Sequence, residues 1–312
     1  MKNLSKIFYL FFILSFLLSC NDDTDNIGEP DFPSMGYIKT TLRDFYTDHK
    51  HPMSVEIYND KIYIGDTKTV ITIFDRDFNQ LGELKDADGE TIEADVVRFN
   101  NDGSFFTHNL SDHTVSYYDA SGTLKNRIEI NALGNNNVNP IAVDHNGHLF
   151  VNCDHHVIRK YDAGLNNVIA ISEEVSTLFD TGGGKCDIRG VCTDINNNVF
   201  ITVDVNISGR DAILKFDNDL NFLTSVGGSG HFNNPHGIGA DNDGNIYVAS
   251  RYQHAVKAYS NDLKFLKATS EGDEPGDSSG LMDSPIGVGI DGNLIYVAES
   301  GNHCITVFRT YY

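Results

Sequence analysis

Short apolar segments of strand length recur along the chain at a regular distance. Each contains an aliphatic or aromatic residue, then an aromatic, then an aliphatic residue or threonine. The central aromatics are Tyr63, Phe106, Phe150, Phe200, Tyr247 and Tyr296, which lie 43–50 residues apart. A spacing of this kind indicates a repeated structural unit.

Each repeat carries the signals of four short strands. A tight turn such as 242–244 precedes the aromatic segment, and a strand of small apolar residues such as 235–241 comes before that turn. A third segment places a β-branched residue three positions before an aromatic, as in Val256 and Tyr259, and a fourth follows a polar turn. Four strands in each repeat, with no helical periodicity, are typical of a β-propeller blade. We therefore expect an all-β, six-bladed propeller with four-stranded blades.

The sixth repeat breaks off after its third strand, at Tyr312. An open blade would expose an unpaired edge. Residues 37–42 lie before the first full repeat, favour a strand and have no partner of their own. We expect this N-terminal strand to close the ring, so that 36–312 form the propeller domain.

The first residues read as an export signal. Lys2 and Lys6 precede an apolar run over 7–18, which is too short for an ordinary spanning helix. Residues 17–20 resemble the lipobox of bacterial lipoproteins, which implies a lipoprotein signal peptide over 1–19 and acylation of Cys20. The polar, acidic stretch 20–35 predicts a flexible tether.

An acidic cluster behind a lipidated cysteine also resembles the surface-export signal of lipoproteins in some Gram-negative bacteria. We expect an outer-membrane lipoprotein held by its lipid alone. The sequence does not distinguish between a protein on the periplasmic face of the outer membrane and one on the cell surface.

Composition removes one class of partner. Asp and Glu number 44 against 23 Lys and Arg, a formal net charge of −21. A nucleic-acid binder needs a basic surface to neutralise phosphates, so we expect no nucleic-acid partner.

The four remaining cysteines fit either two disulfides or buried thiols, and their spacing matches no zinc motif. They are Cys153, Cys186, Cys192 and Cys304. We expect a monomer.

The repeats resemble the NHL repeat, whose pattern runs Pro-x-Gly-aliphatic-x-x-Asp, then Gly-Asn-aliphatic-Tyr-Val-Ala-Asp, then an Asn-rich turn. Residues 234–259 and 284–308 match it best. The resemblance implies the propeller fold. It leaves function open, because such propellers include lyases, lactonase-like relatives and binding platforms.

Repeated residues serve the blade, whereas residues that differ between blades are candidates for a ligand. One position recurs as His113, His156, His254 and His303, with Thr69 and Asp211 in the other blades. Repetition indicates a turn or an inter-blade hydrogen bond here rather than a metal site.

The position that opens each innermost strand is different in every blade: Met53, Asp95, Asn139, Arg189, His236 and Ile286. The second strands end on the same face of the ring. We therefore predict a ligand site at the channel mouth. Its residues are Asp95, Asn139, Arg189, His236, Arg251 and Glu299. The two arginines would suit a carboxylate or sulfate; the alternative is a hydrated channel mouth with a satisfied Asp–Arg pair.

Metal chemistry rests on resemblance alone. Peptidyl-amidoglycolate lyases take zinc ligands from Pro-His motifs in three blades, and only His236 matches here. Gluconolactonase-type propellers suggest Asp95 and Asn139 as oxygen ligands, and streptogramin-lyase-like propellers suggest His236 with Glu299. The metal candidates are therefore Asp95, Asn139 and His236, and the ion would be Ca²⁺, Mg²⁺ or Zn²⁺.

We predict a binding or scaffolding module for a partner protein, peptide or glycan at the envelope. No cofactor is expected for it, and no residue is assigned to catalysis. The alternative is a divalent-metal-assisted lyase or lactonase.

Overall fold

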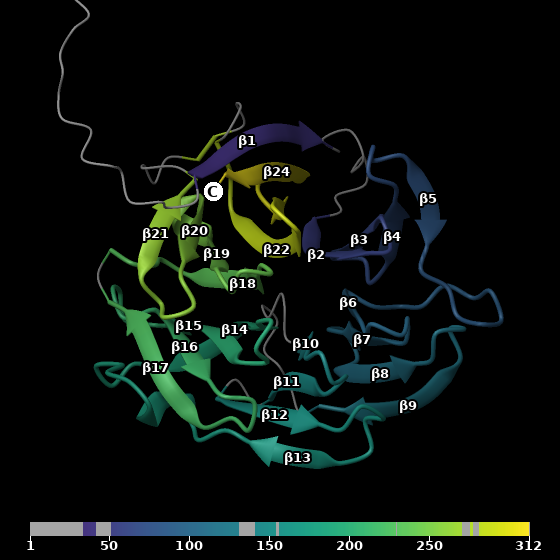
Figure 1. Ribbon diagram of the computed structural model, residues 1–312, viewed down its shortest axis with the longest axis horizontal. Coiled ribbons are helices and arrows are strands. Elements are labelled where there is room, and N and C mark those ends of the chain that lie inside the picture. The colour runs from purple at the N-terminus through teal and green to yellow at the C-terminus, as the bar shows by residue number, and fades with distance from the viewer. Residues whose placement is uncertain are drawn as a thin grey trace, which may run out of the picture. The chain divides into compact units, whose positions relative to one another are not determined.

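The structure is a computed structural model that describes residues 34–41, 51–130, 141–153, 156–228, 230–269, 275–276 and 281–311. Pro33–Tyr311 form one compact unit. In it, six four-stranded antiparallel sheets are arranged around a central axis (Figure 1). The predicted six-bladed propeller is confirmed. Signal peptide 1–19, most of tether 20–35, Cys20 and Asn139 lie outside the described residues. Among the described residues, no helix is long and apolar enough to cross a membrane.

The strands follow the chain around the ring, innermost strand first. Blade 1 comprises β2 (Pro52–Tyr58), β3 (Lys61–Asp66), β4 (Ile71–Phe74) and β5 (Gln80–Glu83). Blade 2 comprises β6 (Val96–Phe99), β7 (Phe105–Asn109), β8 (Thr114–Tyr118) and β9 (Leu124–Glu129). Blade 3 comprises β10 (Ile141–Val143), β11 (Leu149–Cys153), β12 (Val157–Tyr161) and β13 (Val168–Ile171). Blade 4 comprises β14 (Cys186–Thr193), β15 (Val199–Val205), β16 (Ala212–Phe216) and β17 (Phe222–Gly227). Blade 5 comprises β18 (Pro235–Ala240), β19 (Ile246–Ser250), β20 (Ala255–Tyr259) and β21 (Phe265–Ala268). Blade 6 comprises β22 (Pro285–Asp291), β23 (Leu294–Glu299), β24 (Cys304–Tyr311) and β1 (Ser34–Thr41).

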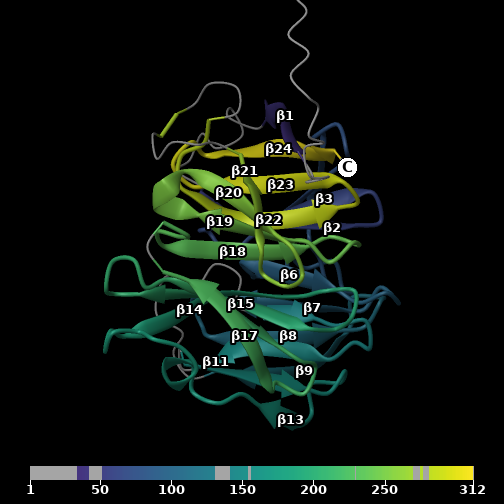
Figure 2. The same ribbon diagram turned by 60° about the vertical axis from the view of Figure 1, so that its left-hand side comes forward.

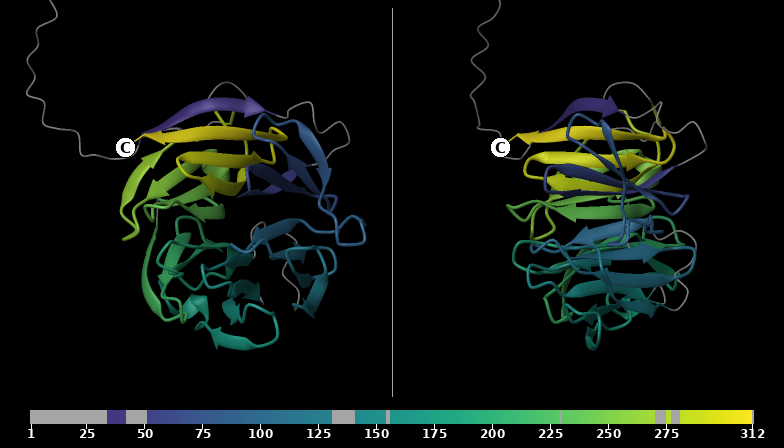
Figure 3. Two further views of the ribbon diagram at one scale, coloured as in Figure 1. Left: turned by 45° about the vertical axis from the view of Figure 1, so that its right-hand side comes forward. Right: turned by 90° about the vertical axis from the view of Figure 1, so that its right-hand side faces the viewer.

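The ring closes as predicted. β1 pairs antiparallel with β24 and forms the outer strand of blade 6 (Figures 1 and 3). The strand runs from Ser34 to Thr41, so it begins three residues before the predicted 37 and ends one residue before 42. The two ends of the propeller are thus joined by a shared sheet, which removes the edge that β24 would otherwise expose.

Apolar side chains fill the space between neighbouring blades. In the described residues each cluster joins two blades, as when Phe150 of β11 packs with Val199 and Ile201 of β15. Strands of blades 5 and 6 lie next to one another in Figure 2. Tyr247 of β19 and Val297 of β23 belong to the apolar cluster between these two blades. Burying a side chain of this size stabilises a fold by about 1.5–3 kcal/mol. The repeated aromatic that revealed the blades is therefore the residue that holds each blade to the next.

Four innermost strands contain a β-bulge near their start. The pairing register shifts at Met53 in β2, Arg189 in β14, His236 in β18 and Ile286 in β22. A bulge inserts an extra residue and redirects its side chain. These are four of the six positions that the sequence showed to differ between blades, so the bulge explains why the blade itself does not dictate their identity.

Neighbouring blades also meet through backbone carbonyls. Asn152 Nδ2 donates to the carbonyl of Ile188 at 2.7 Å, and Thr202 Oγ1 donates to the carbonyl of His236 at 2.6 Å. In blade 1 the position equivalent to Asn152 and Thr202 is Gly65. There the carbonyl of Asp95 accepts instead from Ser54 Oγ at 2.6 Å.

The repeated histidine position has a structural role. Thr69, His113, His254 and His303 adopt φ between 49° and 58°, the left-handed conformation of a tight turn. Between blades, Ser284 N, which directly precedes β22 of blade 6, donates to Nδ1 of His254 in blade 5 at 3.2 Å. Both predicted roles, turn and inter-blade hydrogen bond, are present.

The cysteine alternatives are resolved for three residues. Cys186, Cys192 and Cys304 are buried thiols and take part in no disulfide. The side chain of Cys153 lies outside the described part of the structure.

Candidate functional site

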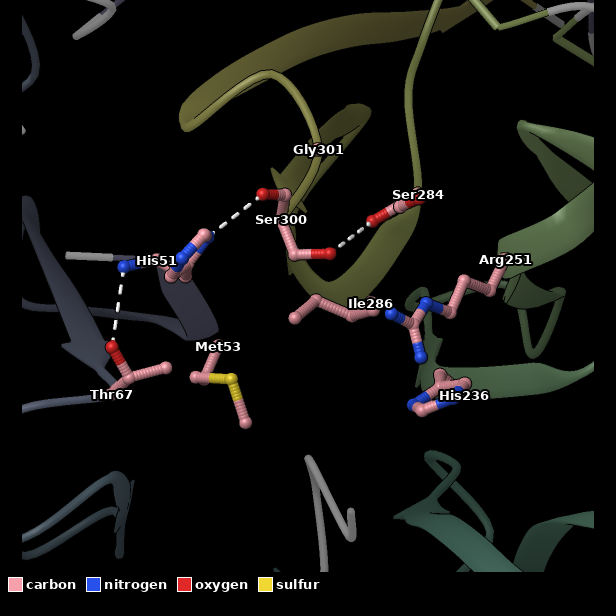
Figure 4. Close-up of a pocket in the computed structure, with 9 residues that line it drawn as sticks. All are labelled: His51, Met53, Thr67, His236, Arg251, Ser284, Ile286, Ser300 and Gly301. Atoms are coloured by element: carbon pink, nitrogen blue, oxygen red, sulfur yellow. Dashed lines mark hydrogen bonds between the residues drawn. The ribbon is translucent and has the colours of Figure 1, made fainter. Parts of the chain in front are cut away.

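A pocket of about 330 Å³ lies at the channel mouth, on blades 5, 6 and 1 (Figure 4). It is lined by His51, Met53, Thr67, His236, Arg251, Ser284, Ile286, Ser300 and Gly301. These residues belong to the bulges of three innermost strands and to the loops at the same end of the blades. This is the face on which the sequence predicted a ligand site.

Hydrogen bonds between loops hold the walls of the pocket. His51 Nδ1 lies 3.0 Å from the carbonyl oxygen of Ser300, and Ser300 Oγ donates to the carbonyl of Ser284 at 3.0 Å. The ring of His51 lies 4.2 Å from that of His303, measured between centroids. Blades 6 and 1 are thereby connected across the point where the chain closes, so this wall depends on ring closure.

His236 occupies the bulge of β18 and is only 2% exposed. Its Nε2 lies 2.9 Å from Asn234 Oδ1, whereas its Nδ1 has no hydrogen-bond partner among the described residues. Burial lowers the pKa of His236 to about 3, and the positive charges of Arg189 and Arg251 act in the same direction. The imidazole is therefore neutral at pH 7.

Arg251 follows β19 and begins the short helix η3 (Arg251–Gln253). Its backbone N donates to the carbonyl of Asn234 at 3.1 Å, which fixes the start of the side chain beside His236. In Figure 4 the guanidinium points toward the pocket and lies next to the imidazole. The Nε atom is buried without a hydrogen-bond partner, and no described carboxylate forms an ion pair with this arginine. An arginine stays charged at any physiological pH, so the pocket holds a positive charge.

Arg189 has a different environment from Arg251. Its Nη2 donates to Asp204 Oδ2 at 2.7 Å and lies 3.3 Å from Asp187 Oδ2. Asp204 Oδ2 also accepts from Asn234 Nδ2 at 2.7 Å. Arg189 therefore does not line the pocket but is linked to His236 through Asp204 and Asn234. The two arginines predicted to act together therefore have different roles: Arg189 forms an ion pair with Asp204, and Arg251 faces the pocket.

Asp95 and Glu299 do not line the pocket, although Glu299 lies directly behind its wall, next to Ser300 in the chain. Asp95 Oδ2 accepts from Leu110 N at 2.6 Å, and burial raises the pKa of Asp95 to about 6. Glu299 is fully buried and accepts from Asp283 N at 2.9 Å, from Asn302 Nδ2 at 2.7 Å and from the hydroxyl of Thr306. Its role is to hold the loop at 283.

The structure thus brings together His236 and Arg251 of the predicted set and links Arg189 to them. Asp95 and Glu299 do not line the pocket, and Asn139 is outside the described residues.

The described residues contain no group of three or more His, Cys, Asp and Glu side chains able to hold a metal ion. Asp95 and His236 do not share a site, since only His236 lines the pocket. A catalytic zinc needs about three protein ligands and an open position. The described donors therefore do not fit the metal centres that the resemblance implied.

Sequence reasoning missed several residues of the pocket. Ser284, Ser300 and Thr67 lie in loops. Thr67 and Ser300 lie four residues after a repeated aromatic, at the position that Arg251 occupies in blade 5. Met53 and Ile286 occupy the variable position, but their apolar side chains give no polar signal of a ligand site. Asn234 was also missed; its only signal is that, like Ser284, it directly precedes a strand that begins with proline.

Comparison with known proteins supports the fold. The model of the NHL repeat matches residues 282–308. The virginiamycin B lyase of Staphylococcus aureus is 11% identical, covers 89% of this chain and 99% of its own, and superposes with a TM-score of 0.61. A catalytically inactive variant of that enzyme with quinupristin is 12% identical, with coverages of 89% and 99% and a TM-score of 0.55.

A structural genomics protein of unknown function from Bacteroides thetaiotaomicron VPI-5482 is 13% identical. It covers 84% of this chain and 70% of its own, with a TM-score of 0.59. No curated protein matches the chain. At these identities the structural likeness shows the fold and not the activity. The chain is a six-bladed β-propeller that contains an NHL repeat.

Proposed function

We propose that this protein is a lipid-anchored envelope protein whose propeller is a binding module for a partner protein, peptide or glycan. The observation that carries the proposal is the pairing of Arg251 and His236 in one pocket. Arg251 offers a cation without an ion pair to any described carboxylate, in a chain of net charge −21. His236 offers a buried nitrogen, Nδ1, that has no hydrogen-bond partner in the part of the chain that the structure describes. Buried polar groups are nearly always satisfied, so these two favour a ligand.

A lyase or lactonase is the second candidate. It is favoured by the unprotonated imidazole of His236 in the pocket, which can accept a proton, although a pKa of about 3 makes it a weak base at pH 7. The virginiamycin B lyases share the fold, although a shared fold does not transfer activity. Elemental analysis of the purified protein separates the candidates. One divalent ion per chain would support the metal-assisted enzyme and contradict a metal-free module.

Filling the pocket should abolish ligand binding without unfolding the protein. Thr67 is exposed at the pocket wall, so Thr67→Trp adds volume there and removes nothing from the core. We would screen oligosaccharides, peptides and small acids for a rise in unfolding temperature. A ligand at 100 times its Kd stabilises the wild type by about 2.7 kcal/mol, and the variant should lose most of this.

The matched control is Thr123→Trp, an exposed threonine in the turn before β9, at the other end of the blades. It should keep the full thermal shift. If a ligand stabilises all three proteins equally, binding occurs outside this pocket and the proposal fails.

Acylation of Cys20 would place the module at the membrane. Cys20→Ala should therefore move the protein from the membrane fraction to the soluble fraction, because no other segment after the leader is apolar enough to anchor it. Fractionation followed by immunoblotting measures this, with Asn21→Ala as the control that stays membrane-bound. Unchanged membrane association of Cys20→Ala would contradict the lipid anchor.

A further inference from the structure

The tautomer of His236 is fixed by a chain of hydrogen bonds. Arg189 pairs with Asp204, whose side chain is therefore a carboxylate that can only accept hydrogen bonds. The Nδ2 group of Asn234 must face this carboxylate, because it is the donor of the Asn234 amide. The Oδ1 atom of Asn234 then faces His236 Nε2 at 2.9 Å. A carbonyl oxygen can only accept, so Nε2 carries the ring proton and donates it. The neutral ring therefore presents an unprotonated Nδ1, which is an acceptor.

The pocket thus offers two complementary groups side by side. Arg251 can only donate and is positively charged, whereas His236 Nδ1 can only accept. A bare carboxylate satisfies the arginine but leaves the histidine without a donor. A ligand that satisfies both needs an anionic oxygen and, beside it, an N–H or O–H group.

Two further features restrict the ligand. Met53 and Ile286 give the pocket an apolar side, and Figure 4 places both between His51 and Arg251. The pocket contains one cation, Arg251, that forms no ion pair with a described carboxylate, in a chain of net charge −21, which disfavours ligands with several negative charges. A single carboxylate attached to a short aliphatic group fits these conditions better than a phosphate or a dicarboxylate.

We infer that the pocket recognises a carboxylate whose adjacent carbon bears a hydrogen-bond donor and a short aliphatic group. Arg251 binds the carboxylate and His236 Nδ1 accepts from the donor. This inference rests on the proposed binding function and names its ligand class. The same chemistry occurs in the C-terminal residue of a peptide, with its amide N–H, and in a free 2-hydroxy acid, with its O–H.

Four probes with the same isobutyl group test the inference by calorimetric titration of the full chain in mild detergent. N-acetyl-L-leucine and 2-hydroxy-4-methylpentanoate carry both the carboxylate and the donor. 4-Methylpentanoate lacks the donor, and N-acetyl-L-leucinamide lacks the charge. Loss of the charge should weaken binding about 10–100-fold, the range for a hydrogen bond to a charged group, and loss of the donor about 3–10-fold. Tighter binding of N-acetyl-L-leucine identifies a peptide C-terminus as the source, and tighter binding of the hydroxy acid identifies a small metabolite.

Two variants assign the roles. Arg251→Met should make N-acetyl-L-leucine and its amide bind equally, while Arg210→Met, an exposed arginine paired with Asp180 outside the pocket, keeps the difference. Asn234→Gly removes the amide that fixes the tautomer, and glycine accepts the positive φ of 57° at this position. It should reduce the preference for donor-bearing probes and keep the preference for the carboxylate. A merely structural role for Asn234 would instead weaken all probes alike.

The outcomes also separate this inference from the proposed function. Equal binding of the acid and the amide overturns the inference. The inference is also overturned if none of the four probes binds but the wider screen yields another ligand whose binding Thr67→Trp abolishes. In that case the proposed binding function is retained. If that screen yields no pocket ligand either, the proposed function fails with it.

Discussion

Deletion of residues 21–42 is expected to lower the unfolding temperature by about 5–15 °C, while deletion of 21–31 leaves it unchanged. The longer deletion removes β1, which pairs with β24 over seven residue pairs. An antiparallel ladder makes about one hydrogen bond for each pair, and each stabilises the fold by about 0.5–1.5 kcal/mol. The loss is therefore at least about 3 kcal/mol, a large part of the 5–15 kcal/mol that is typical of a domain.

Thermal unfolding followed by circular dichroism measures the effect. The shorter deletion is the matched control, because it changes the chain length and net charge but leaves Ser34–Thr41 in place. The longer deletion also exposes β24 as an edge, so we expect concentration-dependent association. Equal unfolding temperatures for the two variants would show that β1 does not close the ring in solution.

Gly65→Ala should destabilise the protein by about 3 kcal/mol or more, although it adds a single methyl group. Gly65 lies in β3, where blade 1 faces blade 2. A methyl group there would overlap the carbonyl oxygen of Asp95 and lie 2.6 Å from Ser54 Oγ. The carbonyl belongs to the backbone and is held by the Ser54 hydroxyl, so neither atom can move aside cheaply. Overpacking a rigid contact costs about 1–3 kcal/mol and sometimes more.

Gly239→Ala is the control for that substitution. Gly239 also lies in a strand, β18, but the atoms nearest to an added methyl group are Ile290 Cγ1 at 3.0 Å and Val288 Cγ1 at 3.4 Å. Both are side-chain atoms that can adjust, so the cost should be about 1 kcal/mol. Denaturant unfolding gives both free energies. The prediction is wrong if Gly65→Ala costs no more than Gly239→Ala.

The sequence by itself determined the number of blades, the strands within them and the closure of the ring. Each blade must bury the same kind of aromatic against the next, so Phe150 and Tyr247 recur at a readable period. Closure of the ring was predictable because the sixth repeat lacks an outer strand, and residues 37–42 near the other end of the chain favour a strand without a partner of their own. These properties depend on local pattern and on the cost of an exposed edge.

The position of the variable residues was also predictable, because His236 and Arg189 occupy one register in successive repeats. The partner of Arg189 is local, because Asp204 lies on the neighbouring strand of blade 4. Asn234 precedes blade 5, so only packing of the blades brings its Nδ2 within 2.7 Å of the Asp204 carboxylate. Arg189 is thus paired inside blade 4, whereas Arg251 faces a pocket that forms only where blades 5, 6 and 1 meet.

The protonation of His236 likewise belongs to the tertiary structure. Its pKa and its tautomer depend on burial, on two arginine charges and on the orientation of one amide group. None of these leaves a periodic mark on the chain, because each arises from contacts made in one blade or at one blade interface only. The repeats therefore determine the propeller, whereas the chemistry of its pocket is decided only where blades 4, 5, 6 and 1 meet.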